Sequence, residues 1–261
     1  MNPFARALPF AILLAAGTAA AAEPRHLAGS GTSLEVDSPC ARQVTIDPDP
    51  SLSGQVSVDA TADNPEELAQ LVLTGGDSVK LRGPTNQCWR PDNSFSFEPT
   101  LVINIRVPPH FPIAIDESGS GDYHVGPAGA FSVDLSGSGK LQAESVTTLT
   151  VDISGSGRLA VAHANGAAHA GISGSGAIDI AEGTLPDLNL DISGSGEFLL
   201  RAGTVAKLKV DTSGSGSVRV DGTVGDASVG ISGSGGVDIA KLTGSISKDI
   251  DGSGEVRIGS R

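Results

Sequence analysis

The stretch LTVDISGSGRLAV, residues 149–161, contains the pattern that decides the fold. On both sides of the central tetrapeptide SGSG (154–157), apolar residues alternate with polar or small ones. A period of two is typical of strands that bury one face. This stretch therefore predicts a strand, a tight turn and a second strand.

The same tetrapeptide recurs along most of the chain. An eighth, modified copy reads DGSG at 251–254, and each copy begins about 18–20 positions after the one before it. A short period kept over eight units predicts a solenoid, because each unit buries its apolar face only against its neighbours. The seven SGSG copies begin at Ser118, Ser136, Ser154, Ser173, Ser193, Ser213 and Ser232.

These units predict an all-β fold, a parallel β-helix (solenoid) of about eight coils of about 18–20 residues. The coils would stack about 4.8 Å apart, the spacing of neighbouring strands. The crossover rule for parallel strands favours a right-handed coil. A further apolar position falls eight residues before most turns and predicts a short third side, at Val146, Leu185, Val205 and Val224. Glycine suits the turns because it reaches positive φ and lets coils approach closely.

Residues 1–22 are typical of a secretory signal peptide. Arg6 supplies the positive charge, Leu8–Ala16 is apolar but too short to span a membrane, and Ala20–Ala22 gives a small-residue cleavage site. We therefore expect an exported protein beginning at Glu23, located in the periplasm or at the cell surface or secreted.

Residues 23–112 predict an irregular, β-rich capping segment, and residues 113–261 predict the repeat solenoid, with 23–261 forming one continuous domain. A short helix is expected over Pro65–Val72, after an acid and an amide that can cap it. The stretch 83–99 lacks periodicity and carries Trp89, and a binding site, if there is one, is expected either in this loop or along the exposed turns of the repeats. Strands are expected at Leu34–Val36, Gln43–Ile46, Gln55–Asp59, Ser78–Leu81 and Leu101–Val107.

The last unit differs from the others in a way that would protect an open end. Lys248 stands where several coils have an apolar residue, and Asp251 replaces serine. Inward or edge charges discourage the addition of further strands.

The charge balance excludes two classes of partner. The 17 basic residues fall to 16 when Arg6 is removed, so the 30 acidic residues leave a net charge of −14. A strongly acidic chain is repelled by nucleic acid and by anionic membrane surfaces. We expect neither partner, and no segment after the leader is apolar enough to insert into a membrane.

The two cysteines, Cys40 and Cys88, both precede the repeats. In an oxidising compartment, a disulfide between them is the default expectation. It would close a long loop that contains most of the capping segment.

A leader, the NPEEL helix at 64–68, the VPP edge at 107–109 and the SGSG coils together resemble a bacterial family. The resemblance is to the "putative autotransporter adhesin, head GIN domain" proteins, and it extends from Leu34 to Ile258. It implies a right-handed β-helix and a surface or periplasmic adhesin-like role.

The most regular polar feature is a ladder of residues two positions before each turn. Two explanations remain open. Each carboxylate could accept hydrogen bonds from its own Ser-Gly turn, which is the expected role. Alternatively, Ca²⁺ could bridge Asp134 with Asp152 and Asp191 with Asp211, and no other cofactor is expected. The ladder reads Asp116, Asp134, Asp152, Gly171, Asp191, Asp211, Gly230 and Asp249.

No constellation of acid, base and nucleophile can be assembled, so no catalytic residue is expected. The chain has few aromatic residues to hold a sugar, at 3%. The expected function is a non-enzymatic adhesin or interaction module that binds a glycan or protein at the cell envelope. The alternatives are a periplasmic structural or envelope component and, less favoured, a polysaccharide-active β-helix enzyme.

Overall fold

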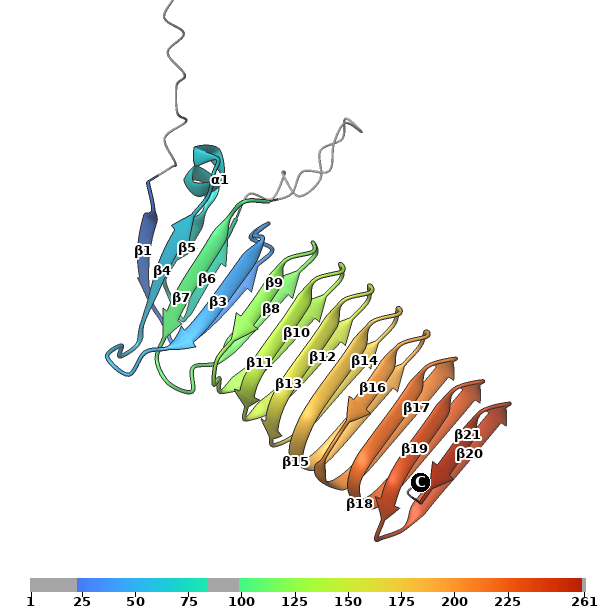
Figure 1. Ribbon diagram of the computed structural model, residues 1–261. Helices are drawn as coiled ribbons and strands as arrows, with labels where there is room; N and C mark the ends of the chain where they lie inside the picture. Colours follow the sequence, from blue (N-terminus) through green and yellow to red (C-terminus); the bar gives the residue numbers. More distant parts are fainter. Residues whose placement is uncertain (1–22, 84–98, 260–261) are drawn as a thin grey trace, which may run out of the picture.

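The computed structural model describes residues 23–83 and 99–259, which form 21 strands and one short helix. All the described strands belong to one sheet, and the repeats wind into a solenoid of about eight turns (Figure 1). The all-β solenoid predicted from the repeat is confirmed. The predicted signal peptide, residues 1–22, lies outside the described residues.

The strands that precede the tetrapeptides stack in parallel, and we call this stack the pre-turn ladder. Equivalent residues lie opposite one another, so that Val133 pairs with Val151 and Val151 with Ala170. Two long strands bend, and only their second halves belong here. The ladder contains β8 (Ile113–Glu117), β10 (Ala130–Leu135), β12 (Thr148–Ile153), β14 (Ala168–Ile172), β15 (Ala177–Ile192), β17 (Gly203–Gly214), β18 (Ser217–Gly233) and β20 (Ile246–Gly252).

The strands that follow the tetrapeptides form a second parallel stack, the post-turn ladder. The first halves of β15 and β18 belong to it, because each long strand runs from one coil into the next. The remaining members are β9 (Asp122–Val125), β11 (Lys140–Val146), β13 (Arg158–Asn165), β16 (Glu197–Leu200), β19 (Gly236–Leu242) and β21 (Glu255–Ile258).

The core fills the space between the two ladders. Val151 and Leu159, from the two strands around the SGSG turn at 154–157, are fully buried, as the alternation predicted. The four apolar residues that led us to expect a third side are also buried in the core: Val146, Leu185, Val205 and Val224. The buried apolar residues of all the coils belong to one continuous cluster.

One polar pair interrupts the core at the first repeat coil. Glu117 occupies the inward position that Leu135 and Ile153 occupy in the next coils. Its carboxylate accepts hydrogen bonds from the Gly119 N–H at 2.6 Å and from the Tyr123 hydroxyl. Burial, followed by the nearby Glu117 charge, raises the pKa of Tyr123 well above its usual value. The buried carboxylate is therefore compensated by two donors.

The segment before residue 113 supplies two further coils, in an order that differs from the sequence. β2 (Ser33–Asp37) and β3 (Gln43–Pro48) pair directly with β8 and β9. β6 (Ser78–Arg82) and β7 (Val102–Val107) then pair with the outer side of β2 and β3. The earliest coil in the sequence is therefore enclosed between two later ones.

Antiparallel strands end the solenoid on this side. β4 (Gln55–Thr61) pairs with β7, β1 (Arg25–Ser30) pairs with β4, and β5 (Val72–Thr74) pairs with β6. The predicted helix is confirmed as α1 (Pro65–Gln70), although it ends two residues early because Val72 begins β5. No described helix is long and apolar enough to cross a membrane.

The other end of the described solenoid is the coil formed by β20 and β21. Lys248 lies opposite the buried Val229 and is itself exposed, as the sequence indicated. Ile250 and Ile258 are 42% and 41% exposed, because no further described coil covers them.

Candidate functional site

The predicted ladder of carboxylates forms a straight row along the pre-turn ladder, and we call it the Asp row. Asp134 pairs with Asp152, and Asp191 pairs with Asp211, so both cation-candidate pairs are adjacent. Glycine occupies two positions of the row, and the carboxylate of the preceding aspartate lies against each of them. In spatial order the row contains Asp37, Asp116, Asp134, Asp152, Gly171, Asp191, Asp211, Gly230 and Asp249.

Asp37 belongs to this row but was not found by sequence reasoning. It pairs with Asp116 although the two are far apart in the sequence, and no SGSG turn follows it. The repeat pattern therefore could not predict that Asp37 belongs to the row. The row ends beyond Asp37 at Arg82, whose Nε donates to the Asp37 carboxylate at 3.0 Å.

The electrostatics differ along the Asp row. At one point Lys209 forms an ion pair of 2.7 Å with Asp211, whose hydrogen bond and charge raise the pKa of the lysine. In the described chain, no cation pairs with Asp116, Asp134 or Asp152. Desolvation, and then repulsion from Asp134, Asp37 and Glu35, raises the pKa of Asp116. The first part of the row is therefore a run of like charges.

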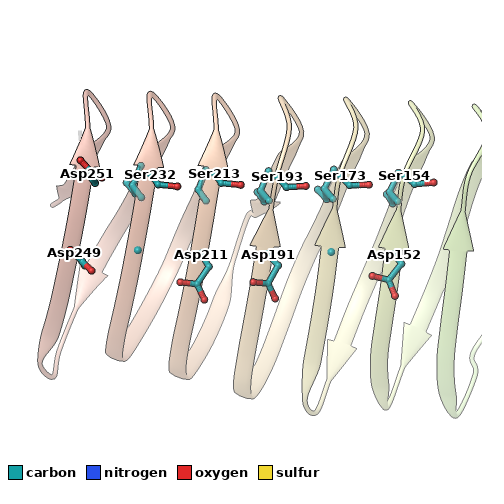
Figure 2. Close-up of a pocket in the computed structure, with 17 residues that line it drawn as sticks. Asp152, Ser154, Ser173, Asp191, Ser193, Asp211, Ser213, Ser232, Asp249 and Asp251 are labelled. Atoms are coloured by element: carbon teal, nitrogen blue, oxygen red, sulfur yellow. The ribbon is translucent and has the colours of Figure 1, made fainter.

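The first serines of the turns form a second row beside the Asp row, which we call the Ser row. In Figure 2 the two rows run side by side, with Asp251 continuing the Ser row after Ser232. No hydroxyl of this part of the row has a hydrogen-bond partner among the described residues. The Ser row here comprises Ser154, Ser173, Ser193, Ser213 and Ser232.

The expected hydrogen bonds from the turns to the Asp row are not found in the described chain, so that prediction was wrong. The turn N–H groups are used instead between coils. The Ser156 N–H donates to Gly137 O, and the Ser175 N–H donates to Gly155 O, each at 3.0 Å. Because these two N–H groups continue the inter-coil hydrogen bonding of the strands, they are not available to the aspartates.

Between the two rows lies a groove of about 620 Å³, the Asp–Ser groove, which runs from Asp152 to Asp251. Its lining includes carboxylates, serine hydroxyls and isoleucines. The carboxylates of Asp152 and Asp211 lie over the neighbouring glycines, because a Cβ on Gly171 would lie 2.5 Å from Asp152 Oδ1. Such a groove offers many acceptors and rotatable hydroxyl donors in a regular array.

The cation hypothesis gains no support from the geometry. Among residues 23–83 and 99–259, no group of three or more His, Cys, Asp or Glu residues is arranged to hold a metal ion. Asp134 with Asp152, and Asp191 with Asp211, would each provide only two residues, whereas Ca²⁺ takes six to eight oxygen ligands.

The predicted disulfide and binding loop fall partly outside the described residues. Cys88 and Trp89 lie in 84–98, which the structure does not describe. Cys40 is buried in the turn between β2 and β3. That turn follows Asp37, which pairs with Arg82, so the segment leading to Cys88 leaves from the adjacent coil. The disulfide therefore stays a prediction.

These features define a class: an all-β solenoid whose repeats place acidic and hydroxyl side chains in parallel rows on one face. The sequence model of the family described as "Putative auto-transporter adhesin, head GIN domain" matches residues 178–261. The resemblance expected from the sequence is thereby confirmed over this segment.

Three solved structures from Parabacteroides species show the same fold at low sequence identity. A "putative lipid binding protein" from Parabacteroides distasonis is 20% identical, with a TM-score of 0.66, and the match covers 90% of this chain and 96% of that chain. A "putative adhesin" from Parabacteroides merdae is 14% identical, with a TM-score of 0.66 and coverages of 90% and 96%. A "putative adhesin" from Parabacteroides distasonis is 16% identical, with a TM-score of 0.62 and coverages of 90% and 97%. At such identities the likeness is one of fold alone. No curated protein matches this chain by sequence.

Proposed function

We propose that this protein is an exported, non-enzymatic adhesin-like module that binds a glycan or protein at the cell envelope through the Asp–Ser groove. The adhesin descriptions of the matching family and of similar structures support an adhesin-like role. The observation that carries the proposal is the Ser row, whose hydroxyls have no described partner and line a groove across several coils.

The charge of the groove selects among ligands. Asp152, Asp191 and Asp211 line it, and only Asp211 of these three is paired with a described cation. Like charges across an interface are costly, so anionic glycans are disfavoured and neutral or cationic groups are favoured. Because the lining repeats from coil to coil, a repetitive ligand would make many weak contacts that together give avidity.

Binding to a glycan array, with and without Ca²⁺ and chelator, tests this function. The purified chain should bind one or more neutral or amine-bearing glycans, or else a basic protein probe such as lysozyme, and release them chemically intact. Because the described groove holds no metal-ligand cluster, chelator should leave binding unchanged. Cleaved glycans would contradict the non-enzymatic role. Binding to neither class of probe would favour the structural envelope component instead.

Export and location are tested separately from binding. In the producing bacterium, protease added to intact cells should digest the protein if it is surface-exposed and spare it if it is periplasmic. A chain that keeps its leader and stays in the cytoplasm would contradict the proposal.

A further inference from the structure

A second depression, of about 440 Å³, lies on the post-turn ladder, away from the Asp–Ser groove. Its floor consists of three alanines, Ala160 and Ala162 from β13 and Ala181 from β15, and we call it the alanine trough. Ala160 pairs with Gln142 on one side and with Asp179 on the other, and both side chains are longer than that of alanine. The trough exists because Ala160 is shorter than both of its neighbours in register, and Ala162 and Ala181 add two more methyl groups to the lining.

One wall of the alanine trough has a preorganised cation. Arg201 donates from Nε to Oδ1 of Asp179 at 2.8 Å and from Nη2 to the other carboxylate oxygen. This paired hydrogen bond, together with the charge of Asp179, raises the pKa of Arg201. A guanidinium held in this fork keeps further N–H donors for a ligand.

The opposite wall is made of polar groups without partners among the described residues. Gln142 and Glu144 come from β11, His124 from β9 and Asp47 from β3. None of these four side chains makes a hydrogen bond or ion pair with another described residue. Since Asp179 and Arg201 neutralise each other, Asp47 and Glu144 leave the lining with a negative charge.

We propose that the alanine trough is a second binding site and that its ligand is an uncharged oligosaccharide. The ligand must lay an apolar surface on the methyl floor, donate hydrogen bonds to carboxylates on one wall, and accept them from Arg201 on the other. A sugar ring meets all three requirements, because its C–H face is apolar and each hydroxyl both donates and accepts. The negative lining disfavours anionic sugars.

The dimensions of the trough agree with a single sugar chain. At Ala160 the floor is one coil wide, and the neighbours that flank it, Gln142 and Asp179, stand about 10 Å apart, which is two strand spacings. The volume of about 440 Å³ falls within the range of small-ligand pockets. This inference does not require the Asp–Ser groove to bind a ligand. An experiment can therefore disprove binding at one of the two sites without affecting the proposal for the other.

Methyl NMR of the purified chain, labelled with ¹³C at alanine methyls, tests the site directly. The probes are cellotetraose, maltotetraose, mannotetraose and N-acetylchitotetraose, each titrated to millimolar concentration. At least one should shift the signals of Ala160, Ala162 and Ala181 saturably, while the buried Ala60 and Ala227 stay unchanged. No saturable shift with any of the four sugars would overturn the proposal.

Variants locate the binding and distinguish it from binding elsewhere on the molecule. Ala162→Leu, at an exposed position, fills the trough and should weaken sugar binding about tenfold or more, or ~1.4 kcal/mol. Arg201→Gln should also weaken it, whereas Asp191→Asn in the Asp–Ser groove should leave it unchanged. Sugar affinity unaffected by both trough variants would refute the site. Shifts induced only by the basic peptide acetyl-Ala-Lys-Ala-Lys-amide would mean a peptide site instead.

Discussion

From the second repeat turn onward, the first glycine stands where a side chain would collide with the backbone of the preceding coil. A Cβ on Gly155 would lie 2.1 Å from the carbonyl oxygen of Gly137 in the preceding coil, and a Cβ on Gly137 would lie 2.0 Å from Gly119 O. Only some turn glycines have positive φ, for example Gly214 at 136°. Close stacking of coils, rather than positive φ alone, therefore explains the repeated glycine.

Gly155→Ala should accordingly destabilise the protein strongly, by about 3 kcal/mol, because backbone atoms of two coils would have to separate. The matched control is Gly236→Ala, where a Cβ would meet nothing within 4 Å. Urea unfolding followed by circular dichroism measures both. Equal stability of the two variants would show that the turns stack less tightly than described.

Asp116 reports on two effects in the Asp row, its own desolvation and then repulsion from neighbouring carboxylates, both of which raise its pKa. Because the pKa of Asp116 is raised in the folded protein, its proton is held more tightly than in the unfolded chain. Its contribution to stability is therefore fully present below the unfolded pKa of about 3.8 and is lost as the pH rises through the folded pKa. Ionised Asp116 thus lowers stability at neutral pH.

Asp116→Asn should increase the free energy of unfolding at about pH 7 and low salt, by a fraction of a kcal/mol after solvent screening. At about pH 3.5, or in high salt, the gain should shrink, since the carboxylate is then largely protonated or screened. Urea titrations at the two pH values give the comparison. A variant less stable than the wild type at neutral pH would argue against repulsion in the row.

At the scale of elements, the strands could be predicted from the sequence wherever coils that are consecutive in the sequence are also neighbours in space. The strands around each SGSG turn were predicted because alternation and period are local signals. The enclosed coil of β2 and β3 was not predicted, since its neighbours β6 and β8 are distant in sequence. The Asp row was therefore found without Asp37. The alanine trough was missed because it depends on how β13 and β15 align.

The predicted disulfide would join the segments that form the two irregular coils. We propose that Cys40, in the turn between β2 and β3, forms a disulfide with Cys88, which lies between β6 and β7 in the sequence. Reduction, or Cys40→Ser with Cys88→Ser, should then lower stability by about 4 kcal/mol in the chain-entropy estimate for a loop of this length. Thermal melts with and without reductant, alongside free-thiol titration, measure this. Two titratable thiols in the unreduced, denatured protein would rule the disulfide out.

At the scale of the whole molecule, stacking converts a short repeat into long rows of side chains. One face carries the Asp and Ser rows, and the post-turn ladder carries the alanine trough. The antiparallel strands β1, β4 and β5 close one end of the described solenoid. The fold could be predicted from the repeat, whereas the ligand depends on which side chains each coil contributes to a shared surface.

The most direct test of the proposed binding function is a charge reversal in the Asp–Ser groove. Binding of the purified chain to the glycan array and to lysozyme should be lost or redirected to anionic ligands by Asp191→Lys, which places a cation in the groove. Asp221→Lys makes the same charge change outside the groove lining and should bind as the wild type does. If both variants keep the wild-type ligands and affinities, the groove is not the binding surface.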